Sequence, residues 1–151
     1  RTDNLGRESE RGAWYMSETL IFDTSVWIDF LNKKRSVASD LLVEYIEQND
    51  QVLLVPTILQ ELLQGIREDA QYNHIKDILS YFTALQIPPV QAAVGAADLY
   101  RSLRKKGLTI RKINDCLIAY YAIEFSITLI HSDSDFDLIG AHSRLKIWKT
   151  K

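Results

Sequence analysis

Short apolar runs alternate with longer amphipathic stretches along this chain from residue 20 onward. An unbroken apolar run of a few residues is typical of a strand buried on both faces, and a 3.6-residue period is typical of a helix. The predicted strands are LIFD, VLLV, ITLIHS and LKIW, with LQIP as a short strand or extended connector. The predicted helices are SVWIDFLN, VASDLLVEYIEQ, TILQELLQGI, about 70–84, about 91–106 and INDCLIAYYAIE, with DFDLIGAHS as a loop or short helix.

Residues that favour helix ends support several of these boundaries. Ser25 lies near the start of the first helix, and Thr57 is a plausible N-cap of the third. Gly107 follows the helix over about 91–106, where a glycine commonly ends a helix. Because strands alternate with helices, the sequence predicts an α/β fold, a three-layer α/β/α sandwich with a mainly parallel central sheet.

The first fifteen residues differ from the rest of the chain. The segment RTDNLGRESERGAWY is charged and aperiodic, and it precedes the sole methionine, Met16. We interpret residues 1–15 as a disordered leader or tag, and residues 16–151 as a single folded domain.

Composition limits the classes of protein to which the chain can belong. With 151 residues, 46% apolar and 25% charged, it has neither a disordered nor a membrane composition, and no apolar run approaches a membrane helix. The formal net charge of -2 means that attraction to nucleic acid must come from a local patch. The only cysteine, Cys116, lies in an apolar run and is expected to be buried, which suits a reducing cytoplasm.

Four carboxylates fall near one edge of the predicted sheet. Asp23 ends the first strand and Asp133 closely follows ITLIHS. In open parallel sheets the carboxyl ends of the strands share an edge, where ligands bind. Glu61 lies in the helix after the second strand, away from the centre of its apolar face, and Asp115 lies at the start of a helix that is apolar almost all round. We therefore expect these four side chains to converge.

Each acid taken alone also has an ordinary structural explanation. Asp23 and Asp133 could be turn or capping residues, Glu61 could be solvated, and Asp115 could complement the helix dipole. Together, however, four carboxylates would repel one another and have raised pKa values unless cations were bound. Mg²⁺ and Mn²⁺ prefer such oxygen ligands, and two such ions could orient a water and stabilise the leaving oxygen of a phosphodiester.

The segments LIFDTSVWIDFL, ELLQGI, INDCLIAYYA and LIHSDSDFDLI resemble, in order and spacing, the motifs of PIN-domain ribonucleases. Within that family the likeness is to the VapC-type toxins of type II toxin–antitoxin systems, and it runs from about residue 20 to the C-terminus. The resemblance implies a PIN-like fold. It also implies a Mg²⁺- or Mn²⁺-dependent endoribonuclease, with one or two ions, that cuts a structured RNA such as tRNA or rRNA.

The resemblance also implies roles for individual residues and for partners. The family's acidic quartet corresponds to Asp23, Glu61, Asp115 and Asp133. The supporting positions correspond to Asp135, which assists the fourth acid, to the hydroxyls of Ser25 and Ser132 near the metal, and to Asn114. The family often has threonine at the position of Ser132, and serine keeps the hydroxyl group. The expected partners are the RNA substrate, a cognate antitoxin that lays an amphipathic segment near the active site, and a second copy in a homodimer.

A basic segment precedes the helix that carries Asp115. Residues 101–112 include six cations and no acid. These are Arg101, Arg104, Lys105, Lys106, Arg111 and Lys112. We expect them to bind RNA phosphates, more weakly as salt rises. The structural alternative is that Arg104, Lys105 and Lys106 complement the C-terminus of a helix, and the two roles are compatible.

Other chemistries fit the sequence less well. The motifs contain no histidine pair for ribonuclease chemistry through the 2′-OH, and His131, at a strand end, is expected to pack. A haloacid-dehalogenase-type phosphatase needs an acid two residues after the strand-end aspartate, where this chain has Ser25. A non-catalytic metal-binding or regulatory module remains the alternative. Only the interpretation as a nuclease predicts metal-dependent cutting of RNA that requires all four acids.

Overall fold

The computed structural model describes residues 7–8, 14–15 and 18–149. Its central sheet contains β3 (Leu20–Phe22), β4 (Val52–Leu54), β5 (Thr83–Ala84) and β6 (Thr128–Ile130), in the order β5-β4-β3-β6. All three strand pairings are parallel. The prediction of a parallel central sheet is therefore confirmed.

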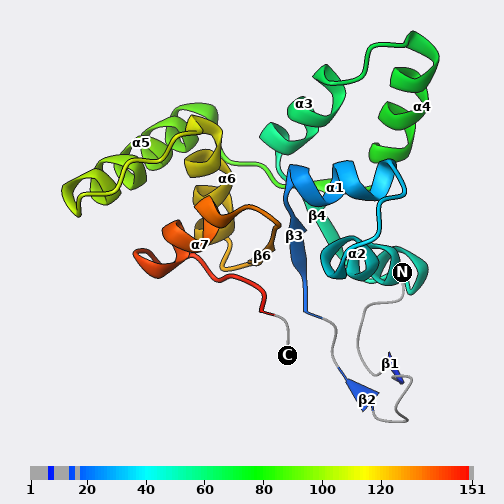
Figure 1. Cartoon of the computed structure of the whole chain (residues 1–151), viewed down its shortest axis with the longest axis horizontal. Coiled ribbons are helices and arrows are strands. Elements are labelled where there is room, and N and C mark those ends of the chain that lie inside the picture. Colours follow the sequence, from blue (N-terminus) through cyan, green and yellow to red (C-terminus); the bar gives the residue numbers. More distant parts are fainter. Residues whose placement is uncertain (1–6, 9–13, 16–17, 150–151) are drawn as a thin grey trace.

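Helices connect and cover the strands. They are α1 (Thr24–Leu31), α2 (Val37–Glu47), α3 (Pro56–Gln64), α4 (Asp69–Leu79), α5 (Pro89–Lys105), α6 (Ile113–Glu124) and α7 (Ser134–Ala141). In Figure 1, helices α5, α6 and α7 lie on the left of β3 and β6, and α1 to α4 lie on the right. This arrangement confirms the predicted three-layer α/β/α architecture.

The core forms around the strands, whose residues in β3, β4 and β6 are buried throughout. Trp27, on α1, is completely buried and contacts Phe82 edge-on, with the ring centroids 5.4 Å apart. Phe22, on β3, makes a similar contact with Tyr45 of α2 at 5.6 Å. Each such side chain contributes roughly 2–3 kcal/mol to folding when it is fully buried. These contacts hold α1 against the segment before β5 and α2 against β3, on either side of Asp23.

One predicted helix start is shifted by a residue, and one predicted N-cap is wrong. The N-cap of α1 is Asp23, whose side chain accepts a hydrogen bond from the backbone of Ser25, so Ser25 lies inside the first turn. The N-cap of α3 is Val55, and Pro56 occupies the first turn. Proline has its φ already fixed for that position and needs no backbone donor there, so Thr57 is left as a buried residue within the helix.

Two further boundaries differ from the prediction. Helix α4 ends at Leu79 instead of near residue 84, and the Ser80 hydroxyl donates to the Asp77 carbonyl at 2.5 Å, which offers the backbone an alternative to continuing the helix. The chain then pairs with β4 as β5, which ends directly before the predicted LQIP. The predicted strand LKIW is reduced to a single bridge between Leu129 and Ile147.

The predicted leader, residues 1–15, falls largely outside the described residues. Within that segment the structure describes only β1 (Arg7–Glu8) and β2 (Trp14–Tyr15), which pair in antiparallel fashion. Among the helices of the described residues, none is long and apolar enough to cross a membrane.

Helices α5 and α6 approach closely at Gly95. A Cβ atom added to this glycine would lie only 2.2 Å from the ring of Tyr120 on α6. The absence of a side chain at Gly95 therefore sets the spacing of α5 and α6. Helix α6 is the one that carries Asp115.

We predict that Gly95→Ala changes the free energy of unfolding with a sign that depends on Tyr120. In the natural background, overpacking against the ring costs roughly 1–3 kcal/mol and outweighs the gain of about 1 kcal/mol in helix propensity, so the chain is destabilised. In a Tyr120→Ala background the clash is gone, and Gly95→Ala should stabilise by about 1 kcal/mol. Urea denaturation of the four chains measures both effects. Stabilisation in both backgrounds would show that the ring moves aside without cost.

Candidate functional site

Two of the predicted acids lie at the carboxyl ends of neighbouring strands. Asp23 directly follows β3, and its backbone N–H donates to the carbonyl of Ile130, the last residue of β6, at 2.9 Å. Asp133 follows β6 and is the N-cap of α7, with its Oδ1 accepting from the Asp135 N–H at 3.0 Å. Both carboxylates therefore cap helices, and capping restricts their orientation at this edge of the sheet.

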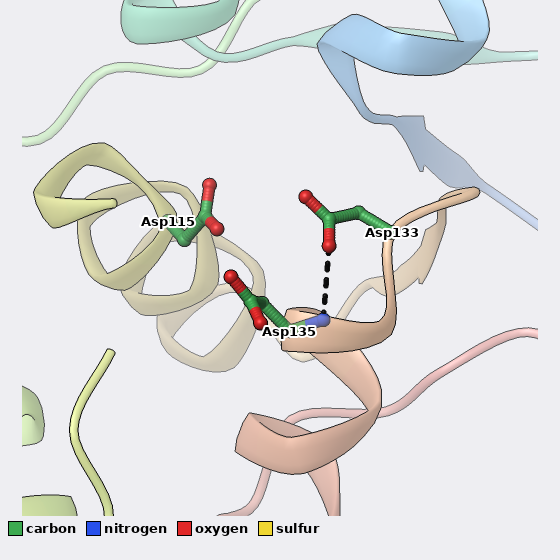
Figure 2. A group of neighbouring side chains, drawn as sticks. All are labelled: Asp115, Asp133 and Asp135. Carbon is green, nitrogen blue, oxygen red and sulfur yellow. Dashed lines mark hydrogen bonds between the residues drawn. The ribbon is translucent and has the colours of Figure 1, made fainter. Parts of the chain in front are cut away.

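Three acids form the group shown in Figure 2, which we call the acidic trio: Asp115, Asp133 and Asp135. Asp115 comes from the first turn of α6, and the other two come from the start of α7. Each offers one oxygen atom, and these atoms all lie within 4.8 Å of one another. This spacing allows one cation to bind all three carboxylates.

Asp115 is the member of the trio most in need of a cation. Its residue is only 5% exposed, and within the described part of the chain its Oδ2 has no hydrogen-bond partner. Burial, followed by the nearby charge of Asp23, raises its pKa to about 7. A buried carboxylate oxygen without a donor among these residues fits a divalent cation, which would compensate its charge.

Asp23 lies outside the trio but interacts with it electrostatically. Burial raises the pKa of its carboxyl group, and the charge of Glu61 adds to the rise. The Ser25 hydroxyl donates to Asp23 Oδ2 at 2.8 Å and opposes the effect. Ser132 in turn donates to the Ser25 hydroxyl at 3.4 Å. The two predicted supporting serines thus form a chain that ends on Asp23.

Glu61, on α3, is held by two hydrogen bonds from other helices. The Thr24 hydroxyl donates to Oε1 at 2.6 Å, and Asn114 Nδ2 donates to Oε2 at 3.2 Å. The donors are sequence neighbours of Asp23 and Asp115, so Glu61 is tied to both of these acids. Thr24 was not among the predicted residues; the available signal was a hydroxyl directly after the strand-end aspartate.

Asp133 has an environment opposite to that of Asp115. Lys112 Nζ lies 2.8 Å from Asp133 Oδ2, and this hydrogen bond, with the N–H of Asp135, lowers the pKa of Asp133. The expectation of a raised pKa at every acid is therefore wrong for Asp133, because a cation of the chain itself compensates it. Arg111 contacts Asp135 more loosely, at 3.4 Å.

His131 packs as predicted and also positions Asp133. Its side chain is 7% exposed, and its ring lies against Phe136 with centroids 5.4 Å apart. Its Nδ1 accepts from the backbone N–H of Asp133 at 2.9 Å, so the ring proton lies on Nε2, which is 3.0 Å from Asp137 Oδ1. This positioning role was not predicted, because it depends on the local turn before α7.

The remaining cations of the basic segment belong to the end of α5. Arg104 and Lys105 lie in its last turn, which agrees with the structural alternative, and Lys106 Nζ donates to the His142 carbonyl at 2.8 Å. Arg104 also stacks over the Tyr100 ring, 5.6 Å from its centroid. A groove of about 650 Å³ runs beside these residues and reaches the start of α6. Its lining includes Tyr100, Arg101, Arg104, Ile113 and Asn114.

The site as a whole is a set of carboxylate oxygens at the end of a parallel sheet, bordered by cations. Hard divalent cations prefer such ligands, and the neighbouring cations suit an anionic substrate. Buried Asp115 and Asp23 would favour cation binding, because it offsets the desolvation that raises their pKa values.

Comparisons with known proteins agree with this geometry. The chain is 29% identical over 128 residues to VapC ribonuclease Mb1587 of Mycobacterium bovis and to ribonuclease VapC11 of Mycobacterium tuberculosis. Each match covers 84% of this chain and 96% of the relative.

Solved structures with a similar fold include VapBC2 of Rickettsia felis bound to a promoter DNA fragment, with TM-score 0.68, 24% identity and coverage of 87% and 99% of the two chains. They also include VapBC-1 of nontypeable Haemophilus influenzae, with TM-score 0.67, 20% identity and coverage of 86% and 96%. A family model described as the PIN domain matches residues 20–141, which is most of the chain. The chain therefore belongs to the PIN-domain family.

Proposed function

We propose that this protein is a metal-dependent endoribonuclease, the toxin of a toxin–antitoxin pair, that hydrolyses phosphodiester bonds in a structured RNA such as tRNA or rRNA. The observation that carries the proposal is the acidic trio, within which the Oδ2 of buried Asp115 has no hydrogen-bond partner among the described residues. The names of the relatives, which describe VapC ribonucleases, support the same activity.

The proposed cofactor is Mg²⁺ or Mn²⁺, as one or two ions. The trio would hold an ion directly, and Asp23 and Glu61 would contribute further oxygen ligands or hold its waters. When bound, such a cation supplies Lewis-acid activation of water and stabilises the charge that develops on the leaving oxygen.

The chain's own residues keep these ligands in place. Ser25 orients Asp23, Thr24 and Asn114 hold the two oxygens of Glu61, and His131 holds the backbone of Asp133. Each hydrogen bond fixes a carboxylate or its backbone before substrate arrives. This preorganisation lowers the cost of assembling the site during reaction.

RNA would reach the acids along the basic segment. Arg101 and Arg104 line the groove that extends to Asn114, whose side chain donates to Glu61. The Tyr100 ring in the same groove offers a face for a base. Arg111 and Lys112 stand directly beside the trio, where the scissile phosphate would lie. Lys105 and Lys106 would add to the positive field at the end of α5.

The proposed partners are a cognate antitoxin and a second copy of the chain. The similar solved structures include complexes named VapBC, and a toxin that cuts cellular RNA needs such an inhibitor. The proposed location is the cytoplasm, which suits the single buried thiol of Cys116, whose pKa burial raises to about 11.

We predict that the purified protein makes discrete cuts in bacterial total RNA with Mg²⁺, mapped by end sequencing, and none with a chelator. Asp115→Asn should reduce the rate roughly 100-fold or more, since several kcal/mol of metal-dependent stabilisation are lost. The matched control is Asp69→Asn, an exposed acid of α4 that should cut like the natural chain. Equal cutting by Asp115→Asn would point to a contaminant. A folded, Mn²⁺-binding protein that cuts nothing would favour a non-catalytic module.

We predict that Mn²⁺ binding weakens as the pH falls through about 7, because a proton then occupies Asp115, whose pKa is about 7 without metal. Below that pH the affinity should fall up to about tenfold per pH unit, as expected where one proton competes with the metal. Isothermal titration calorimetry at pH 6, 7 and 8 measures the effect. An affinity that is constant over this range would show that Asp115 is not a ligand.

We predict that Asp115→Asn stabilises the metal-free protein at pH 8. The folded-state pKa is raised above the ordinary value of 3.8 to about 7, so the natural chain loses stability as pH rises between these values, because only the unfolded state releases the proton readily. The neutral asparagine side chain of the variant avoids this loss of stability. Thermal unfolding should show a gain on the order of 1 kcal/mol, or roughly 2–4 °C, at pH 8 and little difference near pH 4. A lower melting temperature at pH 8 would contradict this assignment.

A further inference from the structure

Lys112 occupies a position that local helix energetics do not favour. It is the N-cap of α6, and its side chain makes no capping hydrogen bond. Serine, threonine, aspartate and asparagine stabilise an N-cap, whereas a cation at the N-terminus of a helix is opposed by the helix dipole. The reason for a lysine here must therefore be sought in its tertiary contacts.

Those contacts are with the acidic trio. Lys112 Nζ lies 2.8 Å from Asp133 Oδ2, and Asp115 and Asp135 add to the field that raises the pKa of the ammonium group. The other oxygen of Asp133, Oδ1, already accepts the N–H of Asp135. A divalent cation that binds Asp133 through Oδ2 must therefore displace the ammonium group, or share that oxygen with it against charge repulsion.

We propose that Lys112 is a phosphate-binding residue whose ammonium group stays paired with the acidic trio until a divalent cation binds. The cation takes the place of the ammonium group on Asp133, and the released side chain binds a non-bridging phosphate oxygen of the RNA. This inference rests on the proposed function and adds an order of events to it: metal first, then the lysine–phosphate contact.

Exchange of this kind is energetically accessible. The Lys112 side chain is 62% exposed, and an exposed ion pair contributes little to stability, so little is lost when it opens. The chain also keeps the lysine close, because the backbone N–H of Asp115 donates to the Lys112 carbonyl at 3.0 Å. The released ammonium group thus stays beside the bound metal, where a scissile phosphate would lie.

A permanent structural ion pair makes the opposite prediction about the metal. If Lys112 only positions Asp133, removing its charge disturbs a ligand and weakens metal binding. If Lys112 competes with the metal, removing its charge ends both the competition and the repulsion, and metal binding becomes tighter. The sign of the change separates the two roles.

The first arm of the test measures Mn²⁺ affinity by isothermal titration calorimetry at pH 8. Lys112→Met should bind Mn²⁺ roughly 3–10-fold more tightly than the natural chain, a change of up to about 1.4 kcal/mol. Lys112→Arg keeps the positive charge and should stay near the natural affinity. Lys76→Met, an exposed lysine of α4, removes the same charge away from the trio and should leave the affinity unchanged. Weaker or unchanged binding by Lys112→Met overturns the exchange.

The second arm measures binding of a fluorescein-labelled twelve-nucleotide uridine RNA by anisotropy, with its integrity checked on a gel. With saturating Mn²⁺, Lys112→Met should bind several-fold more weakly, and the slope of log affinity against log salt should fall by about 1. With a chelator, the natural chain and Lys112→Met should bind alike, since the ammonium group is then held by Asp133. An equal loss under both conditions overturns the metal-gated contact.

The two proposals fail in different ways. A natural chain that binds no Mn²⁺ would remove the metal-dependent function, and the exchange with it. A natural chain that binds Mn²⁺ and cuts RNA, with a Lys112→Met variant that does not gain affinity, would leave the function standing and overturn only the role of Lys112.

Discussion

The cost of keeping carboxylates at the end of a buried sheet is the constraint on which this site depends. Asp23 and Asp115 are each 5% exposed, and burial is the largest cause of the rise in both pKa values. An ionised group in such a place must be compensated by donors, by cations or by a bound metal. The surrounding residues meet this requirement in part. Hydroxyls stabilise Asp23 and Glu61, Lys112 compensates Asp133, and Asp115 keeps one oxygen without a donor in the described part of the chain.

Capping and metal binding are not competing explanations for Asp23 and Asp133. Each is the N-cap of the helix that follows its strand, and each accepts a backbone hydrogen bond with one oxygen. A capping bond of this kind is worth about 1 kcal/mol to the helix. It also restricts the rotation of the carboxylate, so the second oxygen is held in a defined direction. The same local interaction that starts α1 and α7 therefore orients two candidate ligands, and the fold supports the site without additional elements.

The sequence predicted best what depends on local pattern. Helix α6 spans the segment INDCLIAYYAIE as expected, because its nearly unbroken apolar character requires burial. The positions of Asp23 and Asp133 at strand ends followed from the order of strands and helices. Boundaries set by competing local bonds were predicted less well, as at Ser80 and at Pro56, where a side-chain hydrogen bond or a fixed φ decides the outcome.

Two partners of the site residues, Thr24 and Lys112, could not be predicted as such, because they are distant in sequence from the acids that they contact. Thr24 and Glu61 are 37 residues apart, and Lys112 and Asp133 are 21 apart. The composition of the basic segment suggested only a common attraction to phosphate. The structure divides it into cations that end α5 and cations that contact acids. That division places Lys112 beside Asp133, whose pKa it lowers, and no spacing rule contains it.

The N-terminus of α6 brings the separate parts of the site together. Within four residues it carries Lys112, which neutralises Asp133, then Asn114, which holds Glu61, and Asp115, whose Oδ2 has no partner in the part of the chain that the structure describes. A helix is stiff over this length, so these groups move as one unit. The position of that unit is set further along α6, where Tyr120 packs over Gly95 of α5. A shift at this helix contact would displace the counter-ion, the orienting amide and the candidate metal ligand together. The close packing of α5 and α6 at Gly95 thereby positions the helix that carries all three groups.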